Sequence, residues 1–349
     1  MATLSHDLLF IAILGYLFAM MAYAAEYAFG NRGVVARVAR RPAPVARELV
    51  AVGAGGPAPL AETIPVSPAG PSTPHDGDSI EGPSVEPERL ARYADLAGRL
   101  GIVLTVLGFA THLACLICRG IAAGRVPWGN MYEFIIGVTL VASAGWLGLV
   151  TKRPSVRPLG LIVTGGLVIL LGLDETVLYT KVSPLVPALN SYWLKIHVTL
   201  AITASGLLMV GACAAVLHLI RAGYERKTTA EEPYGFPYTL APRLPAADGL
   251  ERLTFRIHAF AYPIWTLAII CGAIWAESAW GRYWGWDPKE TWAFIAWVAY
   301  TCYLHARATP SVRRTVASWI ALIGWCAMMV NLFVVNIFVA GLHSYAGVK

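Results

Sequence analysis

Charged residues are scarce in this chain of 349 residues. They make up 14% of it, whereas an ordinary soluble domain carries about 25%. Hydrophobic residues make up 57%, so the composition excludes an ordinary water-soluble enzyme and excludes disorder for most of the chain. The sequence therefore predicts an all-α fold, a polytopic bundle of helices in a membrane.

Several functional signatures are missing as well. No phosphate-binding loop, Ser–His–Asp arrangement or basic nucleic-acid patch is recognisable, so we expect no nucleic-acid partner. The six cysteines fall inside apolar runs and lack the spacing of a secreted disulfide framework, which favours small core residues. Cys115 and Cys118 form a C-x-x-C pair, but their apolar helix and the lack of a following histidine argue against a redox role.

Apolar runs long enough to cross a bilayer recur along the chain. The first, Leu8 to Phe29, has no basic region before it and no small-residue cleavage site, so we interpret it as a true span rather than a signal peptide. We predict about eight transmembrane helices, at 8–29, 96–118, 131–151, 158–174, 197–220, 257–277, 291–307 and 316–340. The fourth is short for a span.

Basic residues predict the orientation of these helices. With segment 30–99 in the cytoplasm, the inner loops hold 20 of the 27 Lys and Arg residues. Such an excess is typical of cytoplasmic loops. We therefore expect a multi-pass protein of a bacterial inner membrane, in contact with lipid and with both termini outside.

Residues 42–87 are rich in Pro, Gly, Ala and Ser and have few large apolar residues, so they cannot bury enough surface to fold. This predicts three parts: an N-terminal transmembrane helix at 1–29, a disordered cytoplasmic linker at 30–90, and a transmembrane domain at 91–349.

Aromatic residues gather between the sixth and seventh predicted helices, in the stretch WGRYWGWDPKETW at 280–292. The orientation places this stretch outside. Asp287 and Pro288 suit the start of a helix, which explains part of the motif. The remaining aromatic residues are either an interfacial belt or a platform for a large planar ligand. The candidate cofactor-binding residues are Trp280, Tyr283, Trp284, Trp286, Asp287 and Trp292.

Two histidines are predicted to lie on the same side of the membrane as this stretch. His197 opens the fifth helix and His343 follows the eighth. A single interfacial histidine is usually structural. Two neutral imidazoles beside an aromatic loop suit the axial positions of an iron porphyrin, so we name both as candidate metal ligands.

His305 lies at the other end of the seventh helix, about 14 residues from its start and roughly 21 Å deeper. It cannot share a porphyrin with the outer pair. It is either a helix-end histidine or a ligand at membrane depth. His218 and His258 are predicted near the same inner level, but both look adjacent to loops.

The motif WGRYWGWDPKETW resembles the tryptophan-rich signature of haem-handling proteins in cytochrome c maturation. The flanking pieces WLKIHV, YLHAR, VAGLHSYAG and RGIAAGRVPWGNMYEF also resemble that family over about residues 90–349. The most similar branch is CcsA, also called ResC, whose actinobacterial members are often named CcsB.

This resemblance implies that haem b is held at the outer face with His197 and His343 on its iron, and that His305 matches a second, intramembrane ligand. It further implies a ResB/CcsB-like membrane subunit as partner and an apocytochrome c with a Cys-x-x-Cys-His segment as client. The client supplies the attacking thiols, so we expect this protein to contribute no nucleophile and to act within a holocytochrome c synthase.

Three other interpretations remain open from the sequence. One is a CcmC-like component that delivers haem to a chaperone, although such proteins have about six spans. Another is a b-type electron-transfer subunit, although those pair histidines within the bilayer. The third is a membrane scaffold that binds no haem.

Overall fold

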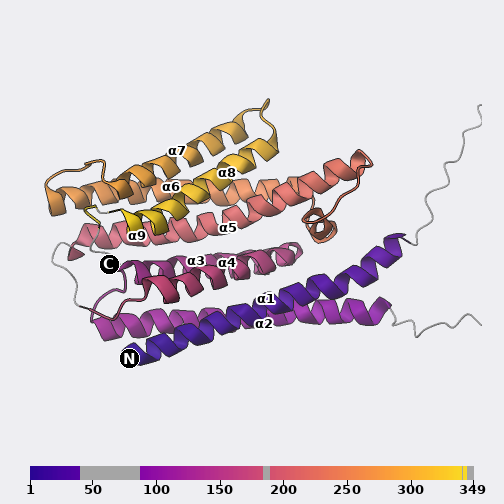
Figure 1. Cartoon of the computed structure of the whole chain (residues 1–349), viewed down its shortest axis with the longest axis horizontal. Helices are drawn as coiled ribbons and strands as arrows, with labels where there is room; N and C mark the ends of the chain where they lie inside the picture. Colours follow the sequence, from indigo (N-terminus) through magenta and orange to yellow (C-terminus); the bar gives the residue numbers. More distant parts are fainter. Residues whose placement is uncertain (40–86, 184–188, 340, 344–349) are drawn as a thin grey trace, which may run out of the picture.

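The computed structural model describes residues 1–39, 87–183, 189–339 and 341–343, and the regular structure in these ranges is entirely helical. The helices lie roughly parallel to one long axis and form an elongated bundle (Figure 1). The all-α prediction is confirmed. The long helices are α1 (Ala2–Ala39), α2 (Pro87–Ala123), α3 (Met131–Lys152), α4 (Gly160–Leu173), α5 (Tyr192–Thr229), α6 (Ala247–Trp280), α7 (Pro288–Ala308) and α8 (Arg314–Met329).

Seven helical stretches of the described chain are long and apolar enough to cross a membrane. Six correspond to α1, α2, α3, α5, α6 and the run from α8 to α9 (Val335–Phe338), and one runs through α4. The remaining predicted span, 291–307, corresponds to α7, which has 21 residues and packs on α8 but falls outside these seven. The prediction of about eight spans therefore agrees closely with the structure.

The fourth span is longer than predicted. It covers Pro154–Leu178 because α4 is extended by the 3-10 helix η1 (Pro154–Leu159) and by the π-helical turn η2 (Asp174–Leu178). Proline residues in η1 interrupt the apolar run at its start, and the acidic residues Asp174 and Glu175 interrupt it at η2, so the sequence did not predict either extension.

The N-terminal helix packs directly on the rest of the bundle. Gly15 of α1 lies so close to α2 that an added Cβ would meet Gly108 Cα at 3.1 Å. Tyr16 and Tyr23 of α1 are fully buried, and Tyr23 contacts Trp146 of α3. The helices also reach into the predicted linker 30–90, to Ala39 from one side and from Pro87 on the other; residues 40–86 of that linker lie outside the described chain.

The two halves of the bundle meet along α5. This helix packs on α3 on one side and on α6 and α8 on the other. Its middle is lined with small buried residues such as Ala204, Ala212 and Ala214, which let the neighbouring helices approach closely.

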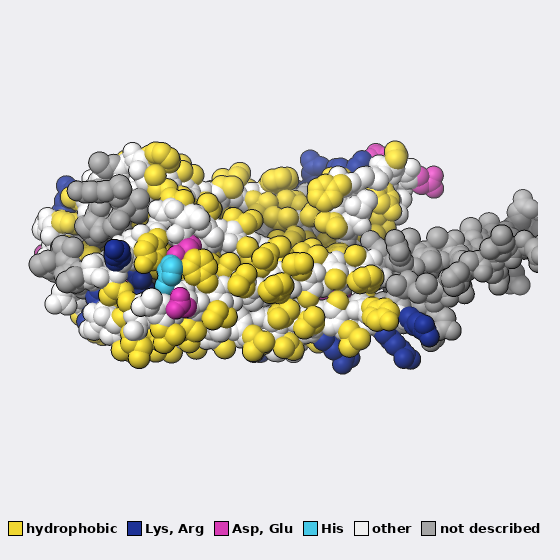
Figure 2. All heavy atoms as spheres, turned by 60° about the horizontal axis from the view of Figure 1, so that its bottom comes forward, with side chains coloured by type: hydrophobic (Ala, Val, Ile, Leu, Met, Phe, Trp, Pro, Cys, Tyr) yellow, Lys and Arg dark blue, Asp and Glu magenta, His cyan; other side chains and the backbone are white. Residues whose placement is uncertain are grey.

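Ion pairs tie the helices together at both ends. At one end, the buried Glu133 carboxylate of α3 accepts from Arg119 at 3.0 Å and from Arg125 at 2.8 Å. At the other end, Arg157 binds Glu26 of α1. Between these ends, the face shown in Figure 2 is mainly apolar, as expected for a surface in contact with lipid.

Candidate functional site

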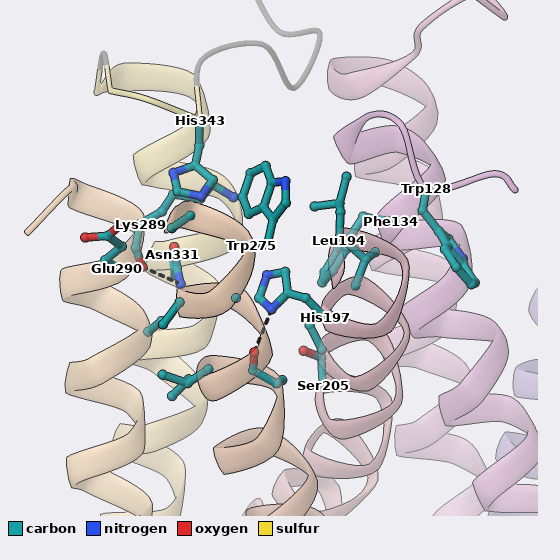
Figure 3. Close-up of a pocket in the computed structure, with 18 of the residues that line it drawn as sticks. Trp128, Phe134, Leu194, His197, Ser205, Trp275, Lys289, Glu290, Asn331 and His343 are labelled. Atoms are coloured by element: carbon teal, nitrogen blue, oxygen red, sulfur yellow. Dashed lines mark hydrogen bonds between the residues drawn. The ribbon is translucent and has the colours of Figure 1, made fainter. Parts of the chain in front are cut away.

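A cavity opens at the end of the bundle where α5 begins and α6 ends. Residues from α3, α5, α6, α7 and α8, the loop 281–287 and the segment after α9 all contribute to its wall. The lining is mainly aromatic and aliphatic, with a few polar groups (Figure 3). Its principal residues are Trp128, Asn130, Met131, Phe134, Leu194, His197, Ser205, Trp265, Trp275, Trp280, Tyr283, Trp284, Lys289, Glu290, Asn331 and His343.

His197 enters the cavity from the second turn of α5. Its Nδ1 lies 2.7 Å from the carbonyl oxygen of Ala268 on α6, a contact that requires Nδ1 to carry the proton. Nε2 is then the unprotonated ring nitrogen and presents its lone pair. Histidines that ligate metals usually have such an oxygen partner on the other nitrogen.

His343 enters from the chain segment that follows α9. Its Nδ1 lies 2.7 Å from Oδ2 of Asp287, the residue before α7. A carboxylate bonded to Nδ1 is again the kind of partner that metal-ligating histidines have on the ring nitrogen that does not bind the metal. Both histidines therefore have the arrangement that metal-ligating imidazoles show.

Trp275 of α6 lies next to both imidazoles (Figure 3). Its ring stacks on His197 with centroids 6.3 Å apart and an angle of 11° between the planes. The same indole meets the ring of His343 edge-on, with centroids 6.0 Å apart. The sequence argument missed this residue because a tryptophan inside an apolar helix looks like any core aromatic.

The tryptophan-rich stretch divides between cavity and surface. Trp280, Tyr283 and Trp284 line the cavity, and Trp280 also packs edge-on against His343 at 5.0 Å. Trp286 is 65% exposed and packs on Phe294, outside the cavity wall. Trp292 packs against a buried cluster formed by α5, α6, α7 and α8 and does not line the cavity.

Asp287 shapes the site without lining it. It is the N-cap of α7 and forms a capping box with Glu290, whose carboxylate accepts the backbone N–H of Asp287 at 3.1 Å. Asp287 also accepts the N–H of Leu342 at 2.7 Å, so one carboxylate fixes both the start of α7 and the segment that carries His343. Burial alone would raise the pKa of Asp287, but the hydrogen bond with His343 and those from the backbone N–H groups of Leu342 and Lys289 outweigh burial and hold the pKa below its usual value.

The backbone before Asp287 is strained. Trp286 adopts a φ of 57°, which is unusual for a bulky residue, and α6 ends on Gly281 at a φ of 69°, where glycine is favoured. The capping box holds the loop in this conformation. The loop therefore has a defined backbone conformation at both ends, at Gly281 and at Asp287.

Small residues make room for His197. A Cβ added to Gly272 would lie 2.7 Å from both Cε1 and Nδ1 of the imidazole, too close for either atom. Four other lining residues, Asn130, Ser205, Trp265 and Asn331, each have a buried polar atom without a hydrogen-bond partner in the described chain. An apolar cavity with two oriented imidazoles and unsatisfied polar atoms fits a large planar ligand that carries a metal and polar substituents.

His305 lies away from this cavity, near the C-terminal end of α7, and its side chain is exposed. His218 and His258 are not adjacent to loops: both are buried in the middle of helices. His218 is bonded to Ser318 at 2.7 Å, and His258 to the carbonyl of Thr254 at 2.8 Å. Loop adjacency was predicted because α5 and α6 each extend about two or three turns beyond their predicted apolar spans.

Fold and cavity together define the class: a multi-pass helical membrane protein with a histidine- and tryptophan-lined cavity at one end of its bundle. The family model described as "Cytochrome C assembly protein" matches residues 128–343, which include every cavity residue named above. This chain belongs to that family.

Curated relatives agree with this assignment. The chain is 33% identical over 260 residues to "Cytochrome c biogenesis protein CcsA" of Guillardia theta, covering 70% of this chain and 85% of the relative. It is 32% identical over 306 residues to the protein of the same name from Picosynechococcus, covering 71% and 87%. The Oryza sativa protein of that name is 30% identical and covers 71% and 84%. The resemblance to CcsA predicted from the motifs is confirmed.

A solved structure shares the fold. The chain "Cytochrome c Heme Lyase CcmF" aligns with a TM-score of 0.52 at 16% identity, covering 93% of this chain. The match covers only 46% of CcmF, so this chain spans less than half of that protein's length.

Proposed function

We propose that this protein binds haem b between His197 and His343 and presents it for covalent attachment to an apocytochrome c. The protein is then one subunit of a cytochrome c synthase, and haem is its cargo. The CcsA name of its relatives supports the pathway, and the cavity supports the ligand.

One observation carries the proposal. Two imidazoles from distant parts of the chain line the same aromatic cavity, and each has its Nδ1 bonded to an oxygen. Imidazoles held in this way would be suitable axial ligands for a haem iron, and bis-imidazole ligation suits low-spin iron.

The cavity residues act by positioning. Indole faces such as that of Trp280 can pack on a porphyrin, and the oriented histidines fix its angle. In the attachment step, each client thiol adds across one vinyl group of haem. The S–H bond and the vinyl π bond break, sulfur bonds to one vinyl carbon, and hydrogen is transferred to the other. The protein contributes proximity and orientation, and no side chain of its own attacks.

The basic residues support an extracytoplasmic location for the cavity. Loops at the opposite end of the bundle carry most of the lysines and arginines, which favours the cytoplasm for that end. The N-terminus and α9 then lie outside, at the same end as the cavity (Figure 1). This orientation places the cavity where translocated, unfolded clients arrive.

The exposed side chain of His305 supports a second site shared with a partner. Its side chain is exposed, so another chain could supply the second ligand of a haem held there. A ResB/CcsB-like membrane subunit is the partner we propose.

Substitution in cells tests the function. His197→Ala and His343→Ala should each abolish the yield of holocytochrome c, and added imidazole should restore part of it by filling the vacated ligand position. Normal yields from both variants would show that these histidines are not the ligands.

A further inference from the structure

Lys289 is the basic residue in the cavity wall that the proposed function does not use. It lies in the first turn of α7 and lines the cavity beside His343, Glu290 and Asn331 (Figure 3). Its side chain is half-buried.

The ammonium group of Lys289 has an unusual partner. Nζ makes its hydrogen bond with the thioether sulfur of Met131 on α3, at 3.6 Å, and forms no ion pair with a described residue. Sulfur is a weak acceptor, so most of the donor capacity of the ammonium is unsatisfied. A cation partly withdrawn from water without an anion is costly.

The carboxylates near Lys289 are already engaged. Glu290 accepts the backbone N–H groups of Gly285 and Asp287, and Asp287 accepts from Leu342 and His343. Neither carboxylate forms an ion pair with Lys289. The local structure thus leaves Lys289 available to an anion from outside the chain.

A second donor points to the same class of ligand. Asn130 precedes Met131 and lines the same cavity, and its Nδ2 is buried without an acceptor, while its Oδ1 is held by the N–H of Glu133. An ammonium and an amide donor that both lack acceptors suit an anionic oxygen group.

We propose that Lys289, assisted by Asn130, binds a carboxylate of the ligand in this cavity. The inference rests on the proposed function, under which that carboxylate is a haem propionate. It assigns Lys289 a positioning role: by anchoring the propionate edge, it fixes the rotation of the porphyrin about the axis through the two imidazoles and so determines where the vinyl groups lie.

Esterified haem provides the test. Full-length protein purified in detergent is titrated with haem and with haem dimethyl ester, in which both carboxylates are neutral, and the Soret band gives both dissociation constants. Wild-type protein should prefer haem over the diester by about tenfold or more, the scale of hydrogen bonds to charged groups. Lys289→Gln should lose this preference and keep the bis-imidazole spectrum.

The matched control is Lys195→Gln. Lys195 is an exposed lysine at the same end of the bundle, two residues from His197, and does not line the cavity. Its variant should discriminate between haem and the diester as the wild type does.

Each outcome is decisive. Equal affinity of the wild type for haem and diester would overturn the proposal even if Lys289→Gln failed to fold. Undiminished preference in Lys289→Gln would overturn it as well. If instead Lys289→Gln altered only the use of client peptides with acidic residues near the Cys-x-x-Cys-His segment, the carboxylate would belong to the client. If the wild type with bound haem did not show a bis-imidazole spectrum, that result would contradict the proposed function itself. It can be told apart from the outcomes above, which concern only the preference for haem over the diester.

Discussion

Asp287 and His343 are 56 residues apart in the chain, and their side chains are joined by a hydrogen bond of 2.7 Å between Oδ2 and Nδ1. The same carboxylate accepts the N–H of Lys289 and thereby caps α7. The tryptophan-rich loop and the C-terminal histidine are thus parts of one structural unit.

The two tasks of Asp287 can be separated by substitution. Serine is a good N-cap but is too short to reach His343, whereas alanine performs neither task. Asp287→Ser should therefore keep wild-type thermal stability yet bind haem about 10–100-fold more weakly, the usual effect of removing a partner of a metal ligand. Thermal unfolding and haem titration measure the two effects. Unchanged affinity in Asp287→Ser would show that the carboxylate serves only the helix.

We expect the lack of a side chain at Gly272 to be as important for the position of the His197 imidazole as its polar partner is. In Gly272→Ala the new Cβ would displace the imidazole and break its hydrogen bond to Ala268, so haem affinity should fall while the helix remains intact. Gly148→Ala is the matched control, because an added Cβ at this helical glycine meets nothing within 4 Å. Equal haem affinity in the two variants would contradict this account of how the ring is held.

Glu133 is predicted to contribute strongly to stability. Its carboxylate is fully buried between two arginines and also accepts the N–H of Gly129 at 2.7 Å. Glu133→Ala leaves buried positive charge without a partner and should cost about 3–5 kcal/mol of unfolding free energy. Glu232→Ala, which removes an exposed ion pair with Lys227, is the comparison and should leave the melting temperature unchanged. Equal melting temperatures in both variants would count against the prediction.

His305→Ala should lower the total haem that co-purifies with the complex of this protein and its membrane partner, while the outer site keeps its spectrum. Cys302→Ala, another exposed position one turn earlier on α7, should leave the haem yield unchanged. If haem yield were the same in both variants, His305 would be an ordinary helix-end histidine.

Much of this arrangement follows from local sequence. Apolar runs predicted the helices, and alternation of those runs placed His197, His343 and the tryptophan-rich stretch at one end, where the structure brings them to one cavity. The start of α7 was also predictable, because Asp287 as N-cap accepts a backbone N–H of the first turn and Pro288 at the first position has no N–H to satisfy.

The tertiary contributions were not predictable. Trp275, Ser205 and Asn331 reach the cavity only through the crossing and rotation of helices distant in sequence, and nothing in their local context distinguishes them from core residues. Similarly, the role of Lys289 depends on the approach of Met131 from α3. Sequence patterns predict which face of a helix is buried, but they do not predict which helix packs against that face.

The central claim is tested most directly by the spin state of ferric haem bound to the purified protein, recorded by electron paramagnetic resonance. The wild type should give a low-spin signal with two imidazole ligands. His197→Ala and His343→Ala should each give a high-spin signal that returns to low spin when imidazole is added. A low-spin signal that persists in both variants without imidazole would contradict the claim that these two residues hold one haem between them.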